Sequence, residues 1–327
     1  MQAQQVRWPL MICGLVLGAL GLASAVAGAE EPASPTTQSS PAPFRVVGYL
    51  PDYRAEQFAP ESCEGLTDLC LFSAEPSDTA GLSLTRLQKL PWNKLREFKK
   101  RQQVRLILCV GGWERSAQFS TVSATPELRR KFAQAALQIC RDQGLDGVDL
   151  DWEHPRNATE QDQYGLLLAE LRTTFRPYEL QLSVTLAGWQ TLPTDAFAAV
   201  DRVQVMAYDH EGQHATLEAA RRDFESVRKA GVPAQKIVLG VPFYGRDTQN
   251  RNQTLAYRDI VSQWNPRPTV DEIGTLYFNG HATIRRKTEF ALGANAGGIM
   301  IWEIGQDAPG DQSLLRVIRD TVRNSRR

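Results

Sequence analysis

Eight short runs of β-branched and apolar residues recur along the chain, and each is followed by a turn signal and a stretch with helical spacing. Two of these helical stretches, residues 126–144 and 217–231, end on glycine, as helices commonly do. The expected strands are RVVGYL at 45, TDLCLF at 67, VRLILCV at 104, DGVDLDW at 146, LQLSVTLA at 180, RVQVMAY at 202, KIVLGVPF at 236 and AGGIMIW at 296. Alternation of strand and helix indicates a parallel sheet, and eight repeats predict a closed (β/α)8 TIM barrel.

A doubly wound open sheet is the competing fold. That fold commonly has fewer strands and carries a Gly-rich phosphate loop after the first one. The first strand here runs instead into GYLPDYR, residues 48–54, which is no such loop. We therefore expect a single α/β barrel domain over residues 45–327.

The N-terminus has the pattern of a secretory signal over residues 1–29. Arg7 precedes an uncharged apolar run from Trp8 to Ala29, and small residues offer cleavage after Ala27 or Ala29. An uncleaved membrane anchor is the alternative, because the run is nearly long enough to span a bilayer. Cleavage would make the protein secreted or periplasmic, without a membrane contact.

Residues 30–44 are rich in Pro, Ser and Thr and predict an extended linker before the barrel. The chain has 37 basic and 37 acidic residues and no basic stripe, which argues against a nucleic-acid partner. A neutral partner fits this charge balance, and we expect a monomer that needs neither a cofactor nor a metal.

Four cysteines follow the signal segment, and their state is open from the sequence. Export would permit disulfides among Cys63, Cys70, Cys109 and Cys140, whose pairing the sequence does not select. Cys70 and Cys109 lie in apolar strand-like runs, where free thiols act as small hydrophobic residues. The four are too scattered in the sequence for a zinc site.

Aromatic and polar residues gather at the C-terminal ends of the expected strands, where a barrel of this kind carries its functional site. They are Tyr49, Trp113, Glu153, Trp189, Tyr208 with Asp209, Tyr244 with Arg246, and Trp302 with Glu303. A single aromatic residue at a strand end commonly serves only to pack the core. Aromatics at six of eight ends predict a cleft lined with flat surfaces, on which sugar rings can stack.

The fourth strand carries carboxylates at alternate positions. Side chains of a strand alternate between its faces, so Asp149, Asp151 and Glu153 should point into the barrel, about 6.5 to 7 Å apart along the strand. Burial and mutual repulsion disfavour ionisation of such a row, so at least one member should hold a proton and could act as a general acid. Glu153, nearest the mouth, is the expected donor.

This row of carboxylates also admits two other interpretations. A divalent-metal loop of the EF-hand type needs Gly where this chain has His154. A structural ion-pair network would need a nearby cation, and Arg156 is the first one after the row. Clustered carboxylates with perturbed pKa favour catalysis over both.

The motif DGVDLDWE resembles the DGxDxDxE signature of glycoside hydrolase family 18, the chitinases and endo-β-N-acetylglucosaminidases. VVGYLPDY, CVGGW, VMAYD, GVPFYGR and GGIMIWEIGQD resemble further strands of that family, in the right order, from Val46 to about Asp307. Six motifs in order make the likeness specific.

The resemblance implies a retaining, substrate-assisted mechanism, in which the acetamido group of the sugar is the nucleophile. Glu153 would then be the acid and base, and Asp151 would stabilise the charge forming on the acetamido nitrogen. Asp149 would share a proton or hydrogen bond with Asp151, and Tyr208 would bind the acetamido carbonyl. The implied substrate contacts come from Tyr49, Trp113, Met206, Asp209, Tyr244, Arg246 and Trp302, with Trp302 as the floor.

Two departures from the family pattern matter. Cys109 stands where the family often has Ser, so support for Asp149 from that strand is in doubt. Residues 247–290 leave room for a helix and a loop but not for the extra α+β domain of many chitinases, which implies a shallower groove.

The expected function is hydrolysis of β-1,4-linked N-acetylglucosamine in chitin oligomers or a similar glycan. An endo-β-N-acetylglucosaminidase acting on N-glycan cores would use the same catalytic residues. A chitinase-like lectin that binds without cleaving is the third possibility. The presence of Glu153 favours an enzyme over the lectin.

Overall fold

The computed structural model describes residues 43–325, so the expected signal segment and nearly all of the expected linker lie outside the described residues. Eight parallel strands form the barrel in the order β1-β13-β8-β7-β6-β5-β4-β2, and β2 pairs back with β1 to close it. They are β1 (Arg45–Pro51), β2 (Asp68–Pro76), β4 (Arg105–Gly111), β5 (Gly147–Asp151), β6 (Gln181–Ala187), β7 (Arg202–Met206), β8 (Ile237–Pro242) and β13 (Gly298–Trp302). The predicted (β/α)8 barrel is confirmed.

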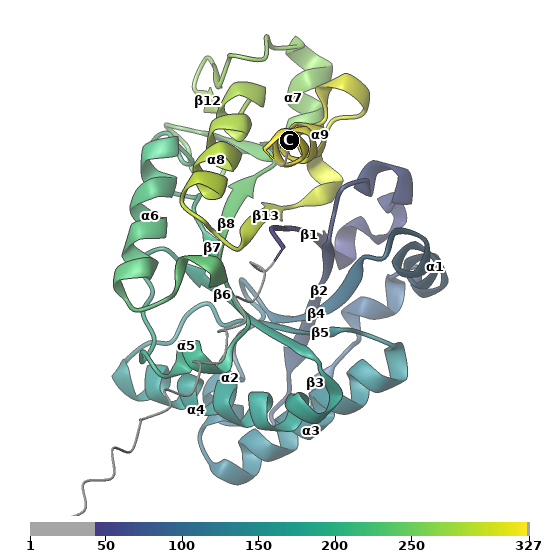
Figure 1. Ribbon diagram of the computed structural model, residues 1–327, viewed down its shortest axis with the longest axis vertical. Helices are drawn as coiled ribbons and strands as arrows, with labels where there is room; N and C mark the ends of the chain where they lie inside the picture. Colours follow the sequence, from purple (N-terminus) through teal and green to yellow (C-terminus); the bar gives the residue numbers. More distant parts are fainter. Residues whose placement is uncertain (1–42, 326–327) are drawn as a thin grey trace, which may run out of the picture. The chain divides into compact units, whose positions relative to one another are not determined.

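Helices surround the strands (Figure 1). They are α1 (Trp92–Gln102), α2 (Phe119–Ser123), α3 (Pro126–Gln143), α4 (Ala158–Phe175), α5 (Ala196–Ala199), α6 (Leu217–Lys229), α7 (Tyr257–Trp264), α8 (His281–Gly293) and α9 (Leu314–Asn324). The two glycine-terminated helices are found as predicted. Gly144 caps α3 in the left-handed conformation at φ +66°, and Gly231, just beyond the last turn of α6, has φ +102°.

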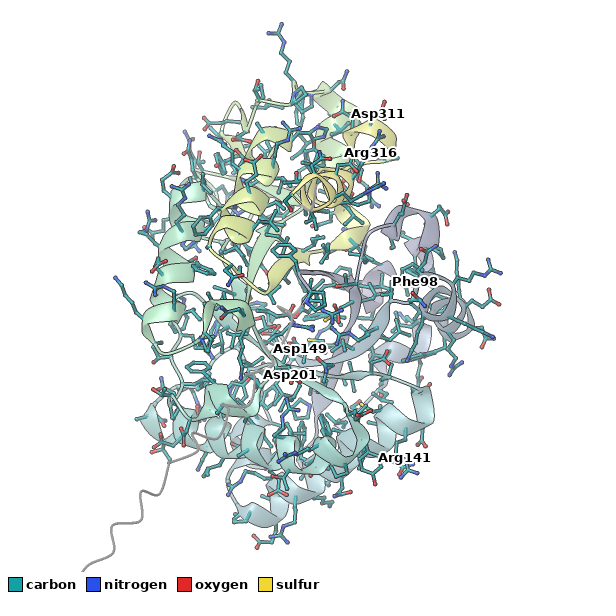
Figure 2. The ribbon with its side chains drawn as sticks, in the orientation of Figure 1. Phe98, Arg141, Asp149, Asp201, Asp311 and Arg316 are labelled. Atoms are coloured by element: carbon teal, nitrogen blue, oxygen red, sulfur yellow. The ribbon has the colours of Figure 1, made fainter. Side chains whose placement is uncertain are left out.

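The alternation predicted for β5 sets the two faces of this strand. Val148 and Leu150 are fully buried on the side of the helices, and Trp152 stacks on Phe119 of α2 with ring centroids 5.3 Å apart. Asp149, on the opposite face, lies at the centre of the barrel (Figure 2). Apolar helix contacts therefore fix the register that brings the carboxylates inside.

The segment between β8 and β13 differs from the prediction of one helix and a loop. It holds α7, α8 and a small antiparallel sheet in the order β10-β9-β12-β11. These strands are β9 (Tyr244–Asp247), β10 (Thr254–Ala256), β11 (Glu272–Ile273) and β12 (Leu276–Tyr277), and a further short strand, β3 (Leu82–Ser83), pairs with β2. Strands of two to four residues are too short to produce a readable hydrophobic period, which is why the sequence pattern missed them.

The four cysteines among the described residues, Cys63, Cys70, Cys109 and Cys140, are all free and buried. Cys70 and Cys109 face the barrel interior, whereas Cys63 and Cys140 pack in the outer core. The interpretation as small hydrophobic residues is therefore confirmed. Between residues 43 and 325, no helix combines the length and the apolar character that crossing a bilayer requires.

Candidate active site

A pocket of about 540 Å³, open to solvent, lies at the C-terminal mouth of the barrel. The lining residues are Tyr49, Phe72, Trp113, Asp151, Glu153, Thr185, Met206, Tyr208, Asp209, Met300 and Trp302. The pocket thus combines three carboxyl groups with a mostly aromatic and thioether wall.

Asp149 is the deepest carboxyl group of the row and is fully buried. Its Oδ2 accepts hydrogen bonds from the hydroxyls of Tyr49 at 2.7 Å and Thr185 at 2.8 Å. Its Oδ1 accepts from Ser183 Oγ at 2.5 Å and Gln204 Nε2 at 2.7 Å. Four donors from β1, β6 and β7 therefore fill the acceptor capacity of this carboxylate.

The hydrogen bond expected between Asp149 and Asp151 is not formed, because the four other donors already occupy Asp149. Asp151 is 3% exposed, and its Oδ1 has no hydrogen-bond partner among the described residues. Burial, followed by the charges of Glu153 and Asp149, raises the pKa of Asp151 well above its ordinary value. Asp151 is thus a buried carboxyl group with an oxygen left to bind a ligand.

Glu153 stands at the rim, two residues beyond the end of β5, with its side chain mostly buried. Burial, followed by the charge of Asp209, raises the pKa of Glu153 to about 7, against an opposing backbone hydrogen bond from Trp113. Ser116 Oγ accepts the Glu153 backbone N–H at 3.1 Å and donates to the carbonyl of Asp151 at 3.1 Å, which fixes the end of the strand. A carboxyl group with a pKa near neutrality suits both proton donation and proton acceptance.

Asp209 follows β7, and it keeps its negative charge because an arginine and a tyrosine outside the pocket contact its carboxylate. Arg246 Nη2 lies 2.8 Å from its Oδ1, and the hydroxyl of Tyr244 donates to the same oxygen. Burial alone would raise its pKa, but contacts with His214, Tyr244 and Arg246 outweigh burial and lower the pKa of Asp209. This ionised carboxylate in turn raises the pKa of Glu153.

The inner wall of the pocket is apolar and closely packed. Trp302 packs edge-on to Phe72 at 4.8 Å between ring centroids and lies 5.6 Å from Tyr49. The hydroxyl of Tyr208 lies 3.8 Å from Met300 Sδ, a weak contact that leaves it able to bind a ligand. Trp302, Phe72 and Tyr49 therefore form one packed aromatic cluster in this wall.

The predicted site residues divide into two groups. Asp151, Glu153, Tyr208, Trp113, Met206, Asp209, Trp302 and Tyr49 line the pocket, and Trp113 is 68% exposed at its edge. The Tyr49 hydroxyl, however, is bonded to Asp149 rather than open to a ligand. Asp149 lies beneath the pocket, and Tyr244 and Arg246 act on Asp209 from outside it.

Five residues of the site were not predicted: Phe72, Ser183, Thr185, Gln204 and Met300. Ser183 and Thr185 alternate along β6 as the carboxylates do along β5, and Gln204 is a polar residue within the apolar β7. Polar residues inside otherwise apolar strands were therefore a usable signal. Among residues 43–325, no group of three or more His, Cys, Asp or Glu side chains could hold a metal ion.

Fold and site together define a (β/α)8-barrel protein with buried carboxyl groups in an aromatic pocket at its C-terminal mouth. Residues 45–307 match the family model for glycosyl hydrolases family 18, and the chain belongs to that family. A family 18 chitinase from the chitin utilization locus of Flavobacterium johnsoniae is 30% identical, with a TM-score of 0.78 over 87% of this chain and 95% of that one.

Two more distant proteins extend the comparison. Chitinase 1 of Aphanocladium album is 27% identical to this chain over the matched part. That match covers 66% of this chain and 65% of the length of the relative, which is less than two thirds of it. A chitinase of Cycas revoluta, crystallised as a mutant with (GlcNAc)4, shares the fold at 22% identity, with a TM-score of 0.74 over 85% of this chain and 99% of that chain.

Proposed function

We propose that the protein hydrolyses β-1,4 linkages of N-acetylglucosamine in chitin oligomers or a similar glycan, with retention and with the substrate's acetamido group as nucleophile. The observation that carries this proposal is the Asp151 carboxyl group, buried beside Glu153 with one oxygen lacking a partner among the described residues. Such an oxygen suits an N–H group of the substrate. Chitinases among the similar proteins support the choice of sugar.

In the first step, Glu153 would donate its proton to the leaving glycosidic oxygen while the acetamido oxygen attacks the anomeric carbon. The pKa of about 7 keeps Glu153 largely protonated in mildly acidic solution. In the second step, the Glu153 carboxylate would accept a proton from water, and that water would open the cyclic intermediate. The same carboxyl group thus returns to its starting state.

Asp151 would accept the acetamido N–H on its free oxygen and stabilise the positive charge that develops there. The positive charge that forms on the acetamido group opposes the burial that raises the pKa of Asp151, so it would favour the ionised carboxyl group in the intermediate, where little water screens the attraction. Trp302 would support the sugar ring from below, and the Tyr208 hydroxyl would bind the acetamido carbonyl. Trp113, exposed at the edge, would stack on a neighbouring sugar.

Replacement of Glu153 by Gln tests the role of the acid. The amide keeps the size of the side chain but has no transferable proton, so turnover should fall by at least about 10²-fold while oligosaccharide binding is retained. Reducing ends released from chito-oligosaccharides measure the first quantity, and calorimetry measures the second. A variant with more than about a tenth of the wild-type rate would exclude Glu153 as the general acid.

Substrate assistance has its own test. A thiazoline mimic of the cyclised intermediate should inhibit strongly, and Asp151→Asn should lose nearly as much activity as the Glu153 variant. Efficient hydrolysis of fully deacetylated chitosan or cellulose would point instead to Asp151 as a direct nucleophile. The same assay on N-glycoproteins separates a chitinase from an endoglycosidase, and binding without turnover on every glycan would indicate a lectin.

The N-terminal sequence supports the further proposal that the protein is exported. Fractionation of cells that express the full chain, followed by N-terminal sequencing of the product, tests both export and cleavage after Ala27 or Ala29. An intact N-terminus in the membrane fraction would indicate an anchor instead.

A further inference from the structure

A groove open to solvent lies on the small antiparallel sheet, and α7 and β12, which both line it, are at the top of Figure 1. Trp264, the last residue of α7, lines this groove and is 47% exposed. Asn252, Gln253 and Thr254 line it from the β9–β10 hairpin. The groove shares no lining residue with the pocket at the barrel mouth, so it is a separate feature of the described surface.

The groove has an aromatic face on an anchored support. Tyr257 and Ile260 are buried on the inner side of α7, which holds the helix that carries Trp264. Leu255 and Leu276 also line the groove and pack against the hydrophobic core. One exposed aromatic residue is common on a protein surface. Here, however, the indole adjoins two partly buried leucines in a groove, and together they offer an apolar surface to a ligand.

The same groove offers polar groups that are free to bind a ligand. The backbone N–H groups of Asn252 and Gln253 are both bonded to Asn250, which fixes the turn. Within residues 43–325, the side chains of Asn252, Gln253 and Thr254 have no hydrogen-bond partner in the protein. Two amides and one hydroxyl can therefore donate to a ligand and accept from it.

The charge of the groove favours a neutral ligand. Asp247 is the only charged residue among the described ones that line it. Its Oδ1 accepts the backbone N–H groups of Gln249 and Asn250, both at 2.8 Å, and its Oδ2 accepts the hydroxyl of Thr275. The carboxylate is thus used within the turn. A ligand with an apolar face, several hydroxyl or amide groups and no charge fits this surface, and the pyranose rings of a neutral saccharide have these properties.

Two arginines connect the turn of the groove to the pocket at the barrel mouth. Arg251, which directly precedes Asn252, donates from Nη2 to the backbone carbonyl of Asp209 at 3.0 Å. Arg246 donates from Nη1 to the carbonyl of Arg251 at 2.8 Å and pairs through Nη2 with the Asp209 carboxylate. Because Asp209 lines the pocket, the groove and the pocket lie on neighbouring parts of one surface.

We propose that this groove is a second saccharide site, which binds a neutral chain of N-acetylglucosamine by stacking on Trp264 and by hydrogen bonds to the neighbouring amides. The choice of this sugar rests on the proposed function, whereas the site itself rests on the groove. Such a site holds a polymer beside the mouth and takes no part in cleavage. Two linked contacts raise the overall affinity for a long chain, while an oligosaccharide that fills only the pocket gains nothing.

Retention on insoluble chitin tests the proposal. Trp264→Ala, made in the Glu153→Gln protein so that the polymer is not consumed, should lower the binding constant by at least about threefold. Trp264→Phe keeps an aromatic face and should restore most of the binding. Tyr178→Ala is the matched control, because Tyr178 is 48% exposed but lies beside Arg141, outside the groove.

The results expected of these variants differ from those of a packing defect. Tyr178→Ala should bind chitin like the parent protein, and the loss in Trp264→Ala should be larger on the polymer than on a soluble trisaccharide. Equal retention of Trp264→Ala and the parent would overturn the proposal. So would a loss of the same size on the trisaccharide, which would place the effect in the pocket.

A measurement without turnover keeps this proposal separate from the proposed function. The indole N–H signal of Trp264, assigned in NMR spectra with Trp264→Phe, should move when chito-oligosaccharides are added. A signal that stays fixed would overturn the proposal, whether or not the signal of Trp113 at the pocket moves. A Trp264 signal that moves in a protein that cleaves no glycan would support the groove as a saccharide site and refute the proposed function instead.

Discussion

Replacement of Lys287 by methionine should stabilise the protein, most strongly at low pH. Lys287 belongs to α8 and is fully buried, and its Nζ donates a hydrogen bond to Asn279 Oδ1 at 2.7 Å. Methionine has a similar length and no charge, so it fits the same space. The substitution therefore removes a buried ammonium group with little change in packing.

The magnitude follows from the pKa. Burial lowers the pKa of Lys287 to about 7, against the opposing charges of Asp271, Asp223 and Glu218. Between pH 7 and the ordinary value of 10.5, the unfolded chain binds a proton that the folded protein does not, so stability rises with pH through this window. At 1.36 kcal/mol for each pH unit, the buried ammonium costs about 5 kcal/mol below pH 7.

The lost hydrogen bond offsets part of this gain. Without Lys287, Asn279 Oδ1 has no donor, which costs about 1–3 kcal/mol. Methionine should therefore raise the free energy of unfolding by about 2–4 kcal/mol at pH 6, and this advantage should disappear between about pH 8 and 10 and turn into a loss of stability above that range.

Urea denaturation at pH 6, 8 and 9.5 measures the difference between the two proteins. Lys236→Met is the matched control, because its Nζ donates to the carbonyls of Phe197 and Val200 and the side chain is half-buried. That variant should be destabilised. A methionine variant at position 287 that is no more stable than the wild type at pH 6, or a difference that does not change with pH, would refute this account of Lys287.

Three further predictions concern the barrel. Asp209→Asn removes a charge that raises the pKa of Glu153, so the alkaline limb of kcat/KM should move to lower pH in a pH–rate profile. Thr185→Val leaves Asp149 with three donors and should lower the free energy of unfolding in urea by about 1.5–3 kcal/mol. Gly147→Ala would place a methyl group 2.2 Å from a carbonyl oxygen of the neighbouring strand, so circular dichroism should show little cooperatively folded protein.

The barrel strands could be predicted because each joins a buried apolar run to a turn signal, and eight such units permit few other arrangements. The same pattern does not predict β9 to β12, because these short strands pair with segments far away in the sequence. Tyr277 of β12, for example, pairs with Arg246 of β9. Pairing of that kind depends on tertiary contacts rather than on local pattern.

The site was predictable to the extent that strand alternation determines it. Alternation places Asp149 and Asp151 inside, but it does not show how far a side chain reaches. Tyr244 was expected at the substrate, whereas its hydroxyl meets Asp209. The contact of His154 with Gln190 joins two loops that lie 36 residues apart in the sequence, so no local pattern predicts it.

Cys109 shows how the barrel compensates for a changed residue. It lies beside Asp149 in the β4–β5 register, where a hydroxyl group was expected to support that carboxylate. Asp149 instead receives its donors from Tyr49, Ser183, Thr185 and Gln204. Because a carboxylate binds only a limited number of donors, the thiol is not needed for this purpose and can fill space as an apolar group. In a closed barrel every interior residue faces several strands, so support for Asp149 depends on the summed donors of the interior and not on one motif position.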